Sequence, residues 1–369
     1  MRFIESRSIF SASKHKLMHI KGFKIGQHNI GLDNSPFIIA ELSANHNGNL
    51  ERALSIVQSA AKAGVHALKL QTYTADTMTL NVELPQFIIN AKDSLWSGRT
   101  LYDLYEEAHT PWGWHKPIFE LAEELGLVCF STPFDETAVD FLEELNVPAY
   151  KIASFELTDL ELIKKVASTG KPLIFSSGMG SIEELGLAIR TARESGCNEI
   201  CILKCTSSYP ASVSDSNIVT LPDMQKRFSC QVGLSDHTLG IGAATASVSH
   251  GAVIIEKHFT LSRDEGGVDS AFSMEPEEMR QLVVETNNAW KALGEIRYGI
   301  GESEKGSIQF RRSIYVVQDV KAGDLLSRDN VRCIRPGYGM QPKYLNKVIG
   351  KKFITDVSAG TPLGEALLN

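Results

Sequence analysis

Short apolar segments rich in β-branched residues recur eight times along the chain, each bounded by turn residues. They cover residues 37–42, 67–73, 127–134, 149–155, 173–179, 200–210, 230–238 and 253–260. Amphipathic segments with helical periodicity lie between them, such as 50–63, which stops at Gly64. Strands that alternate with helices predict a parallel sheet. Eight units over roughly 240 residues favour a closed (β/α)8 TIM barrel over an open sheet.

The predicted strands are apolar where they begin and polar where they end. Glu41 ends the first, Lys69 and Gln71 lie late in the second, and Glu256 and His258 lie late in the eighth. Residues two apart on a strand share a face. Because the active site of a TIM barrel lies at the carboxyl ends of its strands, we predict that these side chains point into the barrel mouth.

Two lysines, Lys69 and Lys151, lie inside apolar strands, where an unpaired lysine is very rarely buried. Two lysines that converge on a barrel mouth indicate an anionic ligand. Strand-end hydroxyls would add hydrogen-bond donors for phosphate and carboxylate groups: Thr132, Ser154, Ser176 and Ser235. A Schiff-base lysine, as in an aldolase, is a competing interpretation. Pairing of each lysine with a glutamate is a structural one, which we expect less for both lysines at once.

His237 and His258 end the seventh and eighth predicted strands, which are neighbours in a barrel. Two imidazoles at one point suit a divalent metal and leave coordination positions open for catalysis. Spacing alone equally fits two hydrogen-bonded structural histidines. Glu41 is a candidate acid/base, metal ligand or sugar contact. Asp269, in a loop after the eighth strand, is a weaker candidate because many loop aspartates are turn formers.

Regions outside the strands complete the predicted domain organisation. Residues 1–20 are expected to be a disordered tail, and the alternative is a true start at Met18. Within the barrel domain, 21–298, a β-hairpin precedes the first strand and could close the barrel floor. The segment 74–115 is longer than ordinary loops and carries aromatic residues, so it is either a substrate-binding loop or packs onto the barrel. A polar linker, 299–307, leads to a compact β-rich module, 308–369.

Bulk composition removes several function classes. The net charge is −7 and no run of lysine and arginine stands out, so nucleic acid is not an expected partner. No apolar run approaches the ~18 residues that span a bilayer, so a membrane is not expected either. Six cysteines in a chain of 369 residues do not suggest a disulfide scaffold. We therefore expect a cytoplasmic protein with reduced thiols.

The strand-end motifs, in their order, closely resemble the sialic acid synthase family. They are PFIIAELSANHNGN, ALKLQTY, STPFD, YKIASFE, SSGM, KCTSSYP, VGLSDHT and IIEKHFTL. This resemblance implies an enzyme that joins phosphoenolpyruvate to an amino-sugar aldehyde, with an antifreeze-like (SAF) domain at 308–369. The long segment most resembles the branch that uses 2,4-diacetamido-2,4,6-trideoxy-L-altrose to make pseudaminic acid. Branches that make N-acetylneuraminic or legionaminic acid are the alternatives.

The resemblance implies a role for each candidate residue. His237 and His258 match metal-binding histidines, with Mn²⁺ expected and Mg²⁺ or Co²⁺ as alternatives. Phosphoenolpyruvate contacts are Lys69, Thr132, Lys151, Ser154, Ser176, Ser235 and Ser207, the last standing where relatives often carry Asn. Positions near the sugar are Glu41, Gln71, Tyr209, Asp269 and Arg335. The family forms homodimers in which the SAF domain brings the arginine to the neighbouring subunit's site.

Three rival functions remain open on the sequence. A deoxy-octulosonate-type synthase would also use phosphoenolpyruvate, but the chain shows no second cluster of phosphate-binding residues. A Schiff-base aldolase would use Lys151 as its nucleophile. A non-catalytic sugar-binding protein could be built around the SAF module, although so many polar strand ends speak against it.

Overall fold

The computed structural model describes residues 20–90 and 94–369, and the chain divides into two compact units after Gly294. The first unit is a barrel and the second is a small module with its own core. The predictions for residues 1–20 and Met18 fall almost wholly on residues 1–19, which lie outside the described part.

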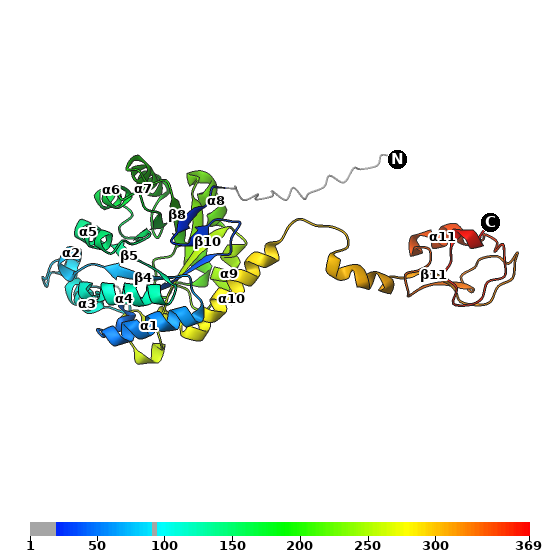
Figure 1. Ribbon diagram of the computed structural model, residues 1–369, viewed down its shortest axis with the longest axis horizontal. Coiled ribbons are helices and arrows are strands. Elements are labelled where there is room, and N and C mark those ends of the chain that lie inside the picture. Colours follow the sequence, from blue (N-terminus) through cyan, green and yellow to red (C-terminus); the bar gives the residue numbers. More distant parts are fainter. Residues whose placement is uncertain (1–19, 91–93) are drawn as a thin grey trace. The chain divides into compact units, whose positions relative to one another are not determined.

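Eight parallel strands close the barrel, which confirms the predicted fold (Figure 1). In order around it they are β10 (Ala252–His258), β3 (Phe37–Glu41), β4 (Ala67–Thr72), β5 (Val128–Pro133), β6 (Tyr150–Ile152), β7 (Leu173–Ser176), β8 (Ile200–Cys205) and β9 (Gln231–Ser235). Each corresponds to one predicted apolar segment. Several are shorter than predicted at their carboxyl ends, because the polar residues there leave the hydrogen-bonded ladder and form loops at the mouth.

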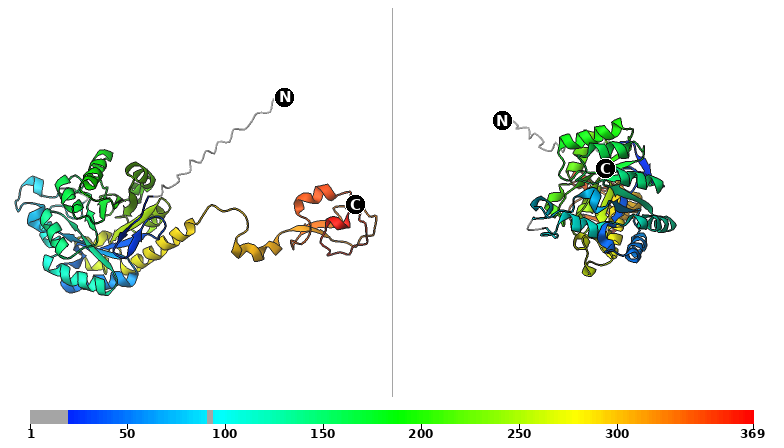
Figure 2. Two further views of the ribbon diagram at one scale, coloured as in Figure 1. Left: turned by 45° about the horizontal axis from the view of Figure 1, so that its top comes forward. Right: turned by 90° about the vertical axis from the view of Figure 1, so that its left-hand side faces the viewer.

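Helices lie outside the ring of strands, as Figures 1 and 2 show. They are α1 (Leu50–Ala63), α4 (Trp112–Glu124), α5 (Glu136–Glu144), α6 (Leu160–Ala167), α7 (Ile182–Glu194), α8 (Thr220–Phe228), α9 (Gly242–Val248) and α10 (Pro276–Leu293). In α1, the Asn49 side chain accepts a hydrogen bond from the backbone N–H of Arg52 and caps the first turn. Gly64 ends the helix with φ 84°, a conformation that glycine adopts without strain.

The long segment predicted between the second and third strands is not an unstructured loop. It contains the short helices α2 (Ala75–Met78) and α3 (Leu101–Ala108) and a 3-10 turn, Pro85–Phe87. Thr74 and Thr100 cap the two helices by accepting backbone N–H groups. Local capping chemistry therefore gives this segment structure of its own.

The predicted hairpin is present and lies at the amino ends of the strands. It consists of β1 (Phe23–Ile25) and β2 (His28–Ile30), which pair antiparallel. Its apolar side chains are buried in the barrel core. The side-chain amide of Gln231, the first residue of β9, donates to the Ile20 carbonyl at 2.9 Å. The hairpin thus covers the barrel floor.

The second unit is built on a small antiparallel sheet of β11 (Ser313–Val316) and β12 (Val331–Ile334), with a one-turn helix, α11 (Leu345–Val348). Ile314, Val316, Leu326 and Phe353 are buried in its own hydrophobic core. The stretch expected as a linker instead carries a 3-10 helix, Glu302–Phe310.

No helix within residues 20–90 and 94–369 is long and apolar enough to cross a membrane. All six cysteines are free thiols, and five of them are buried. This arrangement agrees with the expectation that the chain does not depend on a disulfide framework.

Candidate active site at the barrel mouth

Four charged side chains meet at the carboxyl ends of the strands. The ammonium group of Lys69 forms an ion pair with Glu41 and lies 3.8 Å from Oε1 of Glu256. The ammonium group of Lys151 donates to the same Glu256 oxygen at 3.1 Å. All four side chains are buried. Glu256 therefore bridges two lysines that come from different strands, β4 and β6.

Both lysines are paired with glutamates, so the expectation that this would not hold for both at once was wrong. Glu256 was predicted to point into the mouth, on the same face of the strand as His258, but it was given no role in the site. Two buried lysines require a nearby carboxylate, because an unpaired buried charge is very costly. That requirement is the signal that could have singled out Glu256.

Burial and pairing act against each other in this cluster. Burial raises the pKa of Glu41 to about 7, because the loss of water outweighs the attraction of Lys69. Burial would also raise the pKa of Glu256, but Lys151 and Lys69 outweigh it and lower that pKa. The two lysines thus face one carboxylate that strongly favours its ionised form and a second that favours it much less. Such an excess of positive charge in a buried site favours an anionic ligand.

The predicted hydroxyl groups lie around this cluster. Lys69 donates to the Thr132 hydroxyl at 3.0 Å, and the Ser235 hydroxyl lies 3.5 Å from Glu256 Oε1. The Ser176 hydroxyl is buried and has no hydrogen-bond partner among the described residues. A buried polar group normally has a partner, so this orphaned hydroxyl indicates a place for a ligand oxygen.

Ser154 and Ser207 lie beside a glycine that the fold requires. Their hydroxyl oxygens are 2.9 Å apart. Gly178, in the loop after β7, has φ +43°, and a Cβ there would approach Ser154 Cβ to 2.2 Å and the Ser207 hydroxyl to 2.8 Å. Only glycine lets the loop backbone come this close. The loop and both serines therefore form one continuous polar wall of the mouth.

His237 and His258 lie side by side, with ring centroids 5.4 Å apart. Nδ1 of His237 donates to the Thr206 carbonyl at 2.9 Å, which leaves its Nε2 to face other groups. Burial would lower the pKa of His237, but contacts with Cys205 and the Thr206 carbonyl raise it. Burial lowers the pKa of His258 well below its ordinary value, so that ring is neutral at pH 7.

The two imidazoles fit a catalytic metal better than a structural one. Nδ1 of His258 is buried without a hydrogen-bond partner and lies 3.8 Å from the Asp269 carboxylate. No group of three or more His, Cys, Asp or Glu in the part of the chain that the structure describes could hold a metal. Two protein ligands leave positions for water and substrate oxygens, whereas structural sites are closed by four.

The candidate sugar contacts divide into two groups. Gln71 follows Lys69 by two residues on β4 and is partly exposed, and the Tyr209 ring lies 4.5 Å from that of His237. Asp269 accepts a hydrogen bond from the Ser43 hydroxyl, and burial raises its pKa. These three belong to the barrel mouth. Arg335 lies in the second unit, directly after β12.

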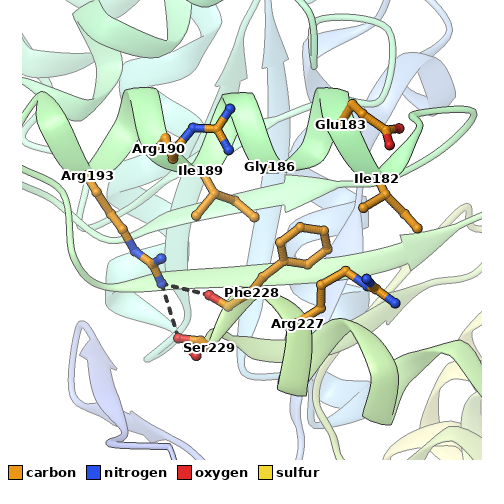
Figure 3. A pocket seen from close by; sticks show the side chains of 9 residues that line it. All are labelled: Ile182, Glu183, Gly186, Ile189, Arg190, Arg193, Arg227, Phe228 and Ser229. Atoms are coloured by element: carbon orange, nitrogen blue, oxygen red, sulfur yellow. Dashed lines mark hydrogen bonds between the residues drawn. The ribbon is translucent and has the colours of Figure 1, made fainter.

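A separate pocket of about 440 Å³ lies outside the barrel mouth, between α7 and α8 (Figure 3). Arg193 in this pocket donates to the backbone carbonyls of Phe228 and Ser229, and Arg227 pairs with Asp223. Its arginines are exposed side chains, two of them engaged by the protein itself. The cluster of buried, mutually paired lysines and glutamates lies at the mouth with the orphaned Ser176 hydroxyl, which makes the mouth the stronger candidate for the reactive site.

Comparison with known proteins identifies the family to which the two units belong. The sequence profile of the NeuB family matches residues 56–298, and that of the SAF domain matches 311–369. The pseudaminic acid synthases of Campylobacter jejuni strain 81-176 and Helicobacter pylori are each 41% identical to the chain. The alignments cover 92% of this chain and 98% of the first relative, and 89% and 96% for the second. The crystal structure of an N-acetylneuraminic acid synthetase from Leptospira borgpetersenii superposes with a TM-score of 0.70 at 30% identity, covering 79% of this chain and 97% of that one.

Proposed function

The chain belongs to the NeuB family, and from that premise we propose that it is a pseudaminic acid synthase. It condenses phosphoenolpyruvate with 2,4-diacetamido-2,4,6-trideoxy-L-altrose and water, giving pseudaminic acid and phosphate. The observation that carries the proposal is the pair of buried lysines around Glu256, beside two histidines, in a chain 41% identical to pseudaminic acid synthases over most of its length.

Lys69 and Lys151 hold phosphoenolpyruvate. A phosphate and a carboxylate satisfy the excess positive charge of the cluster, and the hydroxyls donate to the remaining oxygens: Thr132, Ser154, Ser176, Ser207 and Ser235. By fixing the enol in one orientation, these contacts make the bimolecular step effectively unimolecular. This positioning supplies a large part of the rate enhancement.

His237 and His258 would hold a divalent metal, for which we propose Mn²⁺ over Mg²⁺ or Co²⁺. Synthases of the NeuB family are metal-dependent. When bound, the metal supplies Lewis-acid chemistry at the sugar's aldehyde oxygen. The orphaned Nδ1 of His258 and the Nε2 of His237, whose Nδ1 is held by the Thr206 carbonyl, fit that role.

Carbon–carbon bond formation precedes loss of phosphate. The enol carbon of phosphoenolpyruvate attacks the aldehyde carbon, and the aldehyde oxygen becomes a hydroxyl by taking a proton. Water adds to the cationic carbon that remains and gives up a proton to Glu41. The C–O bond to phosphate then breaks while the hydroxyl on the same carbon gives its proton to the departing phosphate, which leaves a ketone, and the proton held by Glu41 replaces the one taken by the aldehyde oxygen. A carboxylate with a pKa of about 7 is well suited to accept and return a proton near neutral pH.

Gln71, Tyr209 and Asp269 orient the sugar within one subunit, and Arg335 of the partner subunit completes the site in a homodimer. Exposed apolar side chains in both units support this assembly. Four mouth-loop side chains are apolar yet 58–62% exposed: Phe155, Met179, Val213 and Leu239. Tyr338, three residues after Arg335 in the SAF domain, is 68% exposed. Exposed apolar surface of this kind marks interaction sites.

Mixing two inactive variants tests the shared site. His237→Ala removes a barrel residue, and Arg335→Ala removes the SAF residue. In a mixed dimer with exchanged domains, one site has both residues intact. We expect co-refolded mixtures to recover about one quarter of wild-type turnover from random pairing, and recovery of none would mean that each subunit completes its own site.

We further propose that the enzyme acts in the cytoplasm on small molecules, without a nucleic-acid or membrane partner. The net charge of −7 and the free buried thiols support this. Reduced thiols are typical of that compartment.

Phosphate release with three sugars side by side tests the function. Phosphoenolpyruvate and Mn²⁺ are supplied with the trideoxy-altrose, its legionaminic-series isomer or N-acetylmannosamine. Release with the altrose alone is expected. Release with a different sugar would keep the condensation reaction but contradict the assignment to the pseudaminic acid branch. Release with none of the three sugars would contradict the condensation reaction itself.

The Schiff-base aldolase is the rival that the structure disfavours. Its nucleophile must be a neutral amine, whereas Lys151 donates to the ionised Glu256 carboxylate. Treatment with borohydride and sugar should therefore leave the chain unmodified, and a covalent adduct on Lys151 would contradict the proposal.

A further inference from the structure

Aromatic side chains from three separate loops meet beside the two histidines. The ring centroid of Tyr209, after β8, lies 4.5 Å from that of His237 and 5.1 Å from that of Phe272. The Phe272 ring lies 4.9 Å from that of His258 and is 2% exposed. The Trp96 indole packs against Tyr209 at 5.8 Å. One side of the mouth is thus an aromatic wall, made of Trp96, Tyr209 and Phe272.

Trp96 comes from the long segment between β4 and α4, and it is held in place at both edges. Its indole N–H donates to the Val268 carbonyl at 3.0 Å, directly before Asp269. Its ring contacts Tyr209 on the other side. Tyr209 and Asp269, the residue after Val268, are both proposed sugar contacts. Since its single donor is used by the backbone, Trp96 has only apolar surface left to offer a ligand.

Around the two lysines the mouth is lined by charged and hydroxyl groups, so this wall has a distinct part to play. The phosphate and carboxylate of phosphoenolpyruvate belong with the lysines and hydroxyls. The sugar is the substrate that also carries methyl groups, on its two acetamido substituents and at the deoxy carbon C6. An apolar surface beside the sugar contacts suits these groups. It would penalise a hydroxymethyl group, whose hydroxyl would lose its partners.

We propose that Trp96 is a specificity-determining residue, which recognises the methyl groups of a deoxy, acetamido-substituted sugar aldehyde. The inference rests on the proposed function and names the feature of the substrate that this part of the site selects. The opposing interpretation is that Trp96 only fastens the long segment to Val268 through its N–H group.

Two substitutions separate recognition from fastening. Trp96→Phe keeps an apolar ring and loses the N–H donor, whereas Trp96→Gln keeps a donor that can reach toward Val268 and loses the apolar ring. Trp290→Phe is the matched control, because the Trp290 indole also donates to a backbone carbonyl, that of Leu32, at 3.0 Å. Leu32 follows the floor hairpin, so the control removes the same kind of hydrogen bond away from the mouth.

Steady-state phosphate release is measured for wild type and the three variants, with the trideoxy-altrose and with N-acetylmannosamine. We expect Trp96→Gln to lower kcat/KM for the trideoxy sugar by about 10- to 200-fold, the range for loss of an apolar group's recognition. The KM for phosphoenolpyruvate should stay unchanged, and the preference over N-acetylmannosamine should shrink. Trp96→Phe and Trp290→Phe should retain most of that preference.

Other outcomes overturn the inference. A large loss in Trp96→Phe with a mild effect in Trp96→Gln would mean that the residue only fastens the segment. Equal losses in both, a rise in the KM for phosphoenolpyruvate, or no loss in either would also contradict recognition by the ring. If wild type releases no phosphate with either sugar, the proposed function itself fails and this inference falls with it.

Discussion

The floor and the mouth of the barrel are built from the same strands, yet they differ completely in chemistry. At the floor, a hairpin covers the strands with buried apolar side chains. At the mouth, the same strands present four buried charges. On the inner face, Ile39 precedes Glu41 and Ile254 precedes Glu256, each by two residues. On each of these strands, two residues along the inner face separate a packed core side chain from a charged side chain of the site.

Each end also holds a pair of histidines, and the difference between the pairs is informative. The floor rings of His28 and His66 are 5.1 Å apart, close to the 5.4 Å at the mouth. Nδ1 of His66, however, accepts the backbone N–H of Ile38 at 2.9 Å, so that lone pair is already used. At the mouth, Nδ1 of His258 has no such partner. Nε2 of His28 at the floor also lacks a partner, so the decisive difference is the Asp269 carboxylate, which lies 3.8 Å from Nδ1 of His258 and could share a cation with it.

The largest expected effect separates these two pairs. His237→Ala should lower turnover by about 10²- to 10³-fold, the range for loss of one group that stabilises charge in a transition state. The fold should be retained. His66→Ala should instead lower the free energy of unfolding by about 1–3 kcal/mol, since the Ile38 N–H loses its acceptor, and leave kcat/KM unchanged. Phosphate-release kinetics and denaturant unfolding measure both. Near-normal turnover of His237→Ala with added Mn²⁺ would contradict the metal assignment.

The next effect compares two buried lysines. Lys151→Met removes a phosphoenolpyruvate contact, so the KM for that substrate should rise by about 100-fold. Lys257→Met provides the control, because Lys257 is equally buried but pairs with Asp236 at 2.8 Å on the other face of β10. Removing one partner of either buried pair should cost about 3–5 kcal/mol of stability. Equal KM values in the two variants would show that Lys151 is a structural lysine.

The raised pKa of Glu41 makes the stability of the protein depend on pH. Burial raises its pKa from an ordinary 4.5 to about 7, so the folded protein binds a proton that the unfolded chain has released. Its contribution to stability is therefore fully present below pH 4.5 and is lost as pH rises toward 7. The difference in unfolding free energy between wild type and Glu41→Gln should fall across this window, as measured by denaturant titrations at several pH values. A difference that does not vary with pH would rule out the raised pKa.

The smallest effect belongs to the floor. Gln231→Ala removes the hydrogen bond from its side-chain amide to the Ile20 carbonyl. We expect a loss of about 1 kcal/mol in the free energy of unfolding and no change in kcat/KM. A marked fall in activity would mean that the floor hairpin influences the mouth, and that the two ends are less independent than described.

The sequence pattern predicted the barrel because every strand is a strong apolar run bounded by turn residues. It placed Glu41, Lys69 and His258 at the mouth because strand alternation is a local property. It did not single out Glu256 as the bridge between two lysines, since Lys151 and Glu256 are 105 residues apart and meet only through barrel closure. The bond from Trp96 to Val268 spans 172 residues and depends on how the long segment folds back, which no local periodicity encodes.

The most direct test of the central claim is anomalous diffraction at the manganese edge from a crystal grown with Mn²⁺ and phosphoenolpyruvate. The account predicts a manganese peak between His237 and His258, with the phosphate and carboxylate of phosphoenolpyruvate against Lys69 and Lys151. A peak beside His28 and His66 at the floor, or phosphoenolpyruvate bound between α7 and α8 instead of at the mouth, would contradict it.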